Sequence, residues 1–286
     1  MPIAFQPPLP PPDGWAAHRR DVKRCRGSAC YASLAAHFGT DSPRKLENRV
    51  DGRGPYVTKE GDPSQANKFR HWHQGKALPS KGTVEHVAVR SAGAVRLSRW
   101  RDLPLWILLN PEPPPIRTLN RILEGLHVSI RRLVLLQDFR GRSRQINHST
   151  LERDQILAIR NHHSLDAFIA LLCLSRKGEV MENEPQQFLP AACAFDILPR
   201  VLYSHSPLRY RWELLFECLE RIFWKRAYSI GLSYAFPMDV VRSSLEALVV
   251  NPSAQLPRMS GKRYRVIDDD PLKSIEERMA RAVSVT

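Results

Sequence analysis

Residues 64–74 carry polar side chains of the kinds that read the edges of DNA bases. Asparagine and glutamine can make two hydrogen bonds to adenine, and arginine can do the same to guanine. At 100° per residue along a helix, Phe69 and Trp72 point to one side and the polar groups point to the other. The sequence therefore predicts a surface strip that could contact bases, made of Ser64, Asn67, Arg70, His71 and Gln74.

Positive charges flank this strip. Such side chains commonly bind backbone phosphates, contacts that fix the register of a protein on a duplex but do not specify its sequence. The candidates are Lys68, Lys76, Lys81 and Arg90.

A helix must position the strip, and its start and stop signals are present. Asp62 suits an N-cap, Pro63 suits the first helical position, and Gly75 suits a left-handed residue after the last turn. These signals predict a short helix from Pro63 to Gly75, anchored by Phe69 and Trp72.

A second helix is expected after the turn "KALPS". Ser80 or Thr83 can cap it, and Gly93 can end it. Its apolar positions would face the core; they are Val84, Val87 and Ala88.

The run "KFRHWHQGKALPSKGTVEHVA", within residues 62–93, resembles part of the lambda-repressor-like (Xre-type) helix-turn-helix domain, namely its recognition helix and the helix after it. The resemblance implies a helical DNA-binding module whose outward strip enters the major groove. Two features depart from the family pattern: His73 replaces a common Glu, and the nearest upstream helix candidate, residues 33–39, is separated by a long loop. The matching positions are Phe69, Trp72, Gly75, Lys76, Pro79, Ser80, Val84, Val87 and Ala88.

The charge of the chain points to polyanionic partners. Lysine and arginine number 43 against 29 aspartates and glutamates, which gives a net charge of +14 and a pI near 10.0. Much of the excess lies in residues 1–100, where the run described above is found. A basic surface attracts nucleic acid and binds it less well as salt rises. A solvated basic surface without a partner is the alternative.

Composition divides the 286 residues into three parts. Residues 1–13 are a Pro-rich extended arm, residues 14–100 a basic helix-turn-helix-like module, and residues 101–286 a larger helical domain. Within the module, residues 14–39 predict one helix or two short ones ending at Gly39, and residues 40–62 predict a long loop. Beyond residue 115 apolar residues recur at helical spacing, so the fold expected is all-α with strands at most minor.

Two segments of the helical domain invite other interpretations. His162 and Asp166 have the spacing of an acyltransferase signature, but those enzymes need a large mixed sheet that this sequence does not predict. We expect instead that the histidine pair ends one helix and Asp166 starts the next. Residues 209–228 interleave bases and aromatics, as a single-strand binder does. Their apolar residues fall at helical spacing, which favours a core helix.

The remaining features exclude several classes. The five cysteines are scattered, which favours buried thiols over a disulfide framework or a metal site. We expect no metal and no other cofactor. No apolar run reaches the length of a membrane span and no signal peptide is evident, so a cytoplasmic location is expected.

These observations together predict a non-catalytic DNA-binding protein, either a transcriptional regulator or the DNA-engaging subunit of a larger assembly. The alternative is a structural subunit of a nucleoprotein complex that binds RNA or an acidic partner through its basic face. The domain of residues 101–286 could also contact a protein partner. No enzyme is expected.

Overall fold

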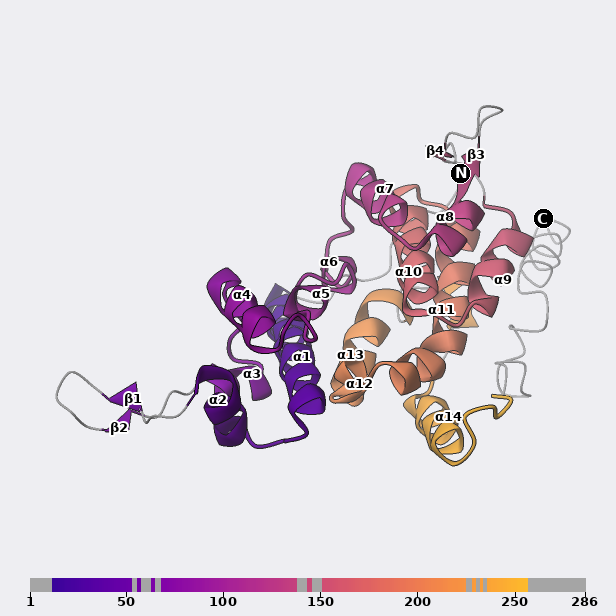
Figure 1. Ribbon diagram of the computed structural model, residues 1–286. Coiled ribbons are helices and arrows are strands. Elements are labelled where there is room, and N and C mark those ends of the chain that lie inside the picture. The colour runs from indigo at the N-terminus through magenta and orange to yellow at the C-terminus, as the bar shows by residue number, and fades with distance from the viewer. Residues whose placement is uncertain are drawn as a thin grey trace, which may run out of the picture. The chain divides into compact units, whose positions relative to one another are not determined.

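The computed structural model describes residues 12–52, 56–57, 63–64, 68–137, 143–145, 151–224, 228–229, 232–233 and 236–256 (Figure 1). Helices dominate these residues, and the strands form three two-stranded antiparallel ladders of two or three residues per strand. The all-α prediction is therefore confirmed. Among the helices described, none combines the length and the apolar character that crossing a membrane requires.

The chain folds into two compact units. The N-terminal unit comprises Pro10–Trp106 and His205–Cys218, and the C-terminal unit comprises the described parts of Ile107–Ser204 and Leu219–Thr286. Composition predicted that residues 205–218 belong to the helical domain of residues 101–286, whereas in the structure they belong to the N-terminal unit. The reason is packing: this segment carries α12 (Ser206–Arg209), which packs on α1 (Pro12–Phe38).

Helix α1 is the central element of the N-terminal unit. It is one continuous helix that ends before Gly39, whose φ of +60° closes it as predicted. Cys30, Tyr31 and Leu34 are fully buried on it. Besides α12, α1 packs against α2 (Pro43–Asp51), α3 (Lys68–His73) and α5 (Leu97–Arg101).

The prediction of a loop over residues 40–62 was wrong, because α2 forms there. The Ser42 side chain accepts a hydrogen bond from the Lys45 N–H, and Pro43 takes the first helical position. Leu46 and Val50, four residues apart, are both buried. Nine residues with a cap and one apolar stripe suffice once α1 and α3 cover the stripe.

The predicted helix from Pro63 to Gly75 was wrong in its first half. Pro63 and Ser64 form β2 (Pro63–Ser64), which pairs antiparallel with β1 (Tyr56–Val57), and α3 begins only at Lys68. Tyr and Val favour strand geometry, and this pairing competes with the N-terminal signals read at residues 62–63.

Helix α4 (Lys81–Arg90) forms where it was expected. Of the two predicted caps, Ser80 is the one used, since its side chain accepts from the Thr83 N–H. Val87 is fully buried, while Val84 and Ala88 are half-buried.

Gly82 offers a stabilising substitution in α4. A Cβ built at this helical position meets no atom within 4 Å. Gly82→Ala is therefore expected to raise the free energy of unfolding by about 0.5 kcal/mol, because alanine loses less backbone entropy in a helix. Chemical denaturation would measure the gain, and a loss of stability would contradict the open space at this position.

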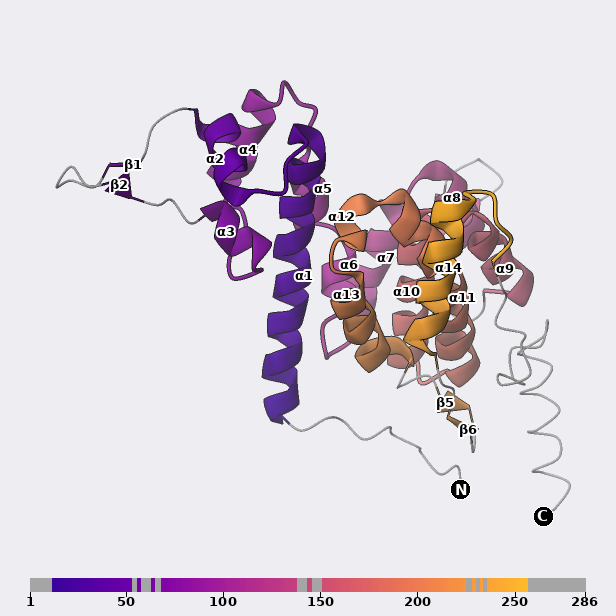
Figure 2. The ribbon, with the colours of Figure 1, turned by 90° about the horizontal axis from the view of Figure 1, so that it is seen from below.

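The core of the C-terminal unit is the helix pair α10 (Leu165–Val180) and α11 (Glu184–Ser204). Gly178 permits their close contact, since a Cβ there would lie 2.4 Å from the Gln187 backbone nitrogen. The pair is surrounded by α7 (Ile116–Glu124), α8 (Val128–Val134), α9 (Arg153–Asn161) and α14 (Met238–Val250). Figure 2 shows α14 lying along α11.

The described residues also form two more ladders, two helices that contain residues of both units, and a π-helical turn. The ladders are β3 (Leu135–Gln137) with β4 (Ser143–Gln145), and β5 (Tyr228–Ser229) with β6 (Leu232–Ser233). Helices α6 (Leu105–Leu108) and α13 (Trp212–Leu219) each carry residues of both units, and a π-helical turn, Glu220–Trp224, follows α13.

The two segments that invited other interpretations, residues 209–228 and the His162–Asp166 pair, have structural roles in the fold. Leu215, Phe216, Ile222 and Phe223 are buried, so the core-helix prediction is confirmed over residues 212–224. At the end of the predicted range it was wrong, because Tyr228 belongs to β5. His162 caps the end of α9 and Asp166 lies in the first turn of α10, as expected. The Asp166 carboxylate accepts a hydrogen bond from the backbone N–H of His127, 2.8 Å away.

All five cysteines are buried free thiols, as predicted. Burial raises the pKa of Cys30, Cys173 and Cys193 to about 12. A thiol with so high a pKa holds little of the reactive thiolate at neutral pH.

Candidate nucleic-acid interface

Two aromatic side chains anchor α3 to the N-terminal unit. Phe69 and Trp72 are 0% and 2% exposed, and their rings meet edge to face with centroids 5.0 Å apart. Helices α1 and α2 pack against α3. Six residues could not hold a helix in water, so this packing is what maintains α3.

The end of α3 is fixed by a backbone approach that only glycine permits. Gly75 has φ +69°, and a Cβ there would lie 2.3 Å from the Arg24 Cα of α1. Gly27, one turn along α1, makes a second close approach, since its Cβ would lie 2.9 Å from the Ala77 carbonyl oxygen. Here α1 and the turn after α3 touch backbone to backbone.

The face of α3 away from its anchors presents polar groups to solvent. Arg70 and His71 are exposed, as are Lys76 in the following turn and Lys81 at the start of α4. None of these four side chains makes a hydrogen bond or ion pair with another described residue. They are therefore available to an outside partner.

The other predicted base-contacting residues are placed differently. Gln74 follows α3 and is half-buried. Ser64 belongs to β2 rather than to α3. Asn67 lies outside the described residues.

Two of the predicted phosphate contacts are instead used inside the unit. Lys68 Nζ pairs with the Asp51 carboxylate at 2.6 Å, and Arg90 Nε donates to the Val50 carbonyl at 2.8 Å. His86 Nε2 lies 3.2 Å from the same carbonyl oxygen. All three side chains meet the C-terminal end of α2, where the helix dipole favours positive charge. A phosphate contact from Lys68 or Arg90 would have to break these bonds.

Sequence reasoning missed the exposed cations of α1 and α2. The composition of residues 40–62 predicts a loop, and a loop gives the charges of α2 no fixed position. The Ser42–Pro43 pair was the signal that could have located this helix. The exposed basic residues of the two helices are Arg19, Arg20, Lys23, Arg24, Arg44, Lys45 and Arg49.

Helix α2 changes which helix is compared with the upstream helix of the helix-turn-helix pattern. It packs on α3 and directly precedes it among the described helices, so the helix nearest upstream of α3 in the described chain is α2 and not residues 33–39. Residues 52–67 separate the two helices in the chain, many more than the three or four residues of the motif's turn.

A cluster of aromatic rings surrounds His73 at the end of α3. Its ring meets Tyr31 of α1 at 4.9 Å and Tyr210, which follows α12, at 6.0 Å between centroids. Arg211 Nη2 donates to the His73 carbonyl at 2.9 Å. Burial first, and then the Arg211 charge, lower the pKa of His73 below its usual 6.5, while Asp41 acts in the opposite direction.

This lowered pKa predicts a pH-dependent stability. In the unfolded chain His73 binds a proton more readily than in the folded unit. The stability it contributes is therefore complete above pH 6.5 and is lost as the pH falls toward the lowered folded pKa. We expect the free energy of unfolding of the wild type to fall more than that of His73→Gln between about pH 7 and pH 5, as measured by denaturant titrations.

The neighbouring exposed residue provides the control for this experiment. His71→Gln should keep the pH dependence of the wild type. A His73→Gln variant that also keeps it in full would show that His73 is not the responsible group.

Comparisons of the chain with models of protein families, with curated proteins and with solved structures gave no match.

Proposed function

We propose that the protein is a non-catalytic DNA-binding protein of the cytoplasm that engages duplex DNA through α3 and the start of α4. It would act as a transcriptional regulator or as the DNA-engaging subunit of a larger assembly. The observation that supports this most directly is a set of exposed side chains that make no hydrogen bond or ion pair with a described residue. They lie on α3 and just after it, and α3 is held by its buried aromatic residues; the set is Arg70, His71, Lys76 and Lys81. The five cysteines of the protein are buried and form no disulfide, which suits a reducing compartment such as the cytoplasm.

The burial of the aromatic residues favours duplex over single-stranded nucleic acid. Proteins that bind single strands stack bases on exposed aromatic rings. Phe69 and Trp72 are turned into the core and cannot do so. An exposed arginine on a helix instead suits the major groove of B-form DNA, which admits a helix, whereas the major groove of duplex RNA is too narrow.

The charge of the surrounding unit supports the same conclusion. Residues 1–100 hold 17 basic and 8 acidic side chains. The exposed cations of α1 and α2 add to the field around α3. Such a field attracts the DNA backbone without regard to sequence, and Arg70 would add discrimination.

Selection from random duplex DNA, with an RNA pool in parallel and a salt series, tests this proposal. Arg70→Ala should weaken binding to the selected sequence by about 1–3 kcal/mol and relax the preference at one position. Lys76→Ala and Lys81→Ala should weaken all sequences alike, each reducing the slope of log K against log salt by about 1.

Arg132→Ala is the matched control, because Arg132 is an exposed arginine of the C-terminal unit. It should leave affinity and preference unchanged. Two outcomes would overturn the proposal that α3 recognises a DNA sequence and would favour the nucleoprotein-subunit alternative. One is retention of duplex DNA without an enriched sequence, and the other is a preference for RNA at equal salt.

A further inference from the structure

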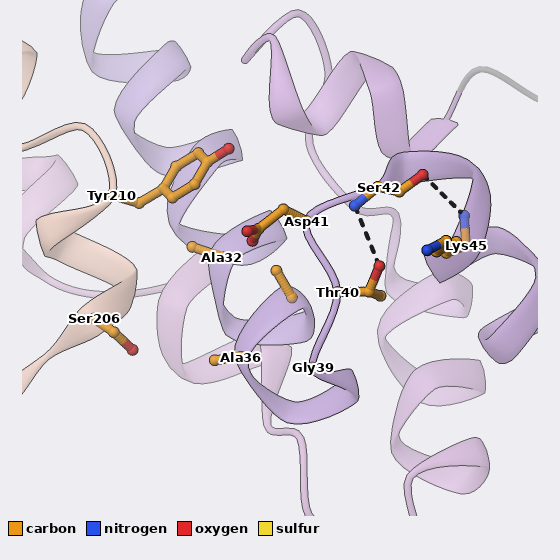
Figure 3. Close-up of a pocket in the computed structure, with 10 residues that line it drawn as sticks. Ala32, Ala36, Gly39, Thr40, Asp41, Ser42, Lys45, Ser206 and Tyr210 are labelled. Atoms are coloured by element: carbon orange, nitrogen blue, oxygen red, sulfur yellow. Dashed lines mark hydrogen bonds between the residues drawn. The ribbon is translucent and has the colours of Figure 1, made fainter.

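The N-terminal unit contains a pocket with a volume of about 570 Å³ (Figure 3). It lies where the C-terminal part of α1, the start of α2 and α12 meet. Ala32, Ala35 and Ala36 of α1 line one side with methyl groups only, which leaves the space open. Its volume falls within the range of small-molecule sites.

Two opposite charges line this pocket without neutralising each other. Asp41 and Lys45 are both exposed, and neither side-chain charge makes a hydrogen bond or ion pair with a described residue. Here each is left to an outside partner.

The backbone around both charges is fixed. The Tyr31 hydroxyl donates to the carbonyl oxygen of Asp41, which holds the loop in place. The Ser42 N–H donates to Thr40 Oγ1 at 3.3 Å, and Ser42 Oγ accepts from the Lys45 N–H. Figure 3 shows the Asp41 carboxylate on the side of the loop that faces Tyr210.

We propose that this pocket binds a small zwitterion, namely an amino acid with an apolar side chain. Its ammonium group lies against the Asp41 carboxylate, which accepts a charge-assisted hydrogen bond, and against the Tyr210 ring, which attracts the cation to its face. Its carboxylate pairs with Lys45, and its side chain covers the alanine methyls. A ligand with only an ammonium group would be repelled by the Lys45 charge, and a ligand with only a carboxylate would be repelled by the Asp41 charge.

Calorimetric titration of the full chain tests this site and is independent of DNA binding. The probes are L-leucine and L-phenylalanine, with 3-methylbutylamine and 4-methylpentanoate as analogues that carry one charge each. At least one amino acid should bind saturably, and the analogues should bind at least about tenfold more weakly, because each lacks one charge-assisted contact.

Three pocket variants and two controls complete the test. Asp41→Asn and Lys45→Gln should each weaken amino-acid binding by about tenfold or more, and Ala36→Leu should abolish it by filling the space. Arg44→Gln on α2 and Glu85→Gln on α4, both exposed and outside the pocket, should bind as the wild type does. The absence of saturable binding at millimolar amino acid, or wild-type affinity in both Asp41→Asn and Lys45→Gln, overturns the proposal.

Discussion

Gly75→Ala is expected to lower the stability of the N-terminal unit by about 3 kcal/mol or more, because two penalties add. The first is conformational, since Gly75 has φ +69°, a region that costs an L-residue about 1–2 kcal/mol. The second is steric. The new Cβ would lie 2.3 Å from the Arg24 Cα and 2.7 Å from its Cβ, so α1 and α3 must separate.

Amide hydrogen exchange over α1 and α3 measures this effect, and Gly93→Ala is its control. Gly93 also has a positive φ, +78°, but a Cβ there meets nothing within 4 Å. It therefore carries the conformational penalty alone. Equal loss of protection in the two variants would contradict the close contact between the backbones of α1 and the turn after α3.

Arg176→Ala is expected to destabilise the C-terminal unit by about 3–5 kcal/mol, the range for breaking a buried ion pair. The Arg176 side chain is fully buried, and Nη1 lies 2.5 Å from the Glu179 carboxylate. Nη2 donates to the Asn110 carbonyl, and the guanidinium lies 5.7 Å from the centroid of the Phe223 ring. The substitution removes all these contacts and leaves a cavity in the core.

Arg242→Ala provides the matched control in the same unit. Arg242 also faces an acidic residue one helical turn away, Asp239, but at 3.9 Å and with both side chains largely exposed. Its loss should cost only a few tenths of a kcal/mol. Denaturant titration and hydrogen exchange over α10 and α11 would compare the two variants, and a similar small loss in both would show that burial of Arg176 adds nothing.

Much of the local structure follows from the sequence alone, because its signals act over a single turn. Ser80 caps α4, Gly39 ends α1, and the apolar period predicted over residues 209–228 gives buried helical turns over residues 212–224. The anchoring of α3 by Phe69 and Trp72 follows from helical spacing in the same way. Each of these depends on residues close together in the chain.

The tertiary structure decided what depends on distant neighbours. α2 is stable because α1 and α3 cover Leu46 and Val50, while composition alone suggested a loop. Lys68 and Arg90 looked like free cations until α2 supplied Asp51 and a carbonyl to bind them. Which charges stay available for a partner is thus set by packing, since a short-range pattern gives the type of a side chain but not the residues brought beside it from elsewhere in the chain.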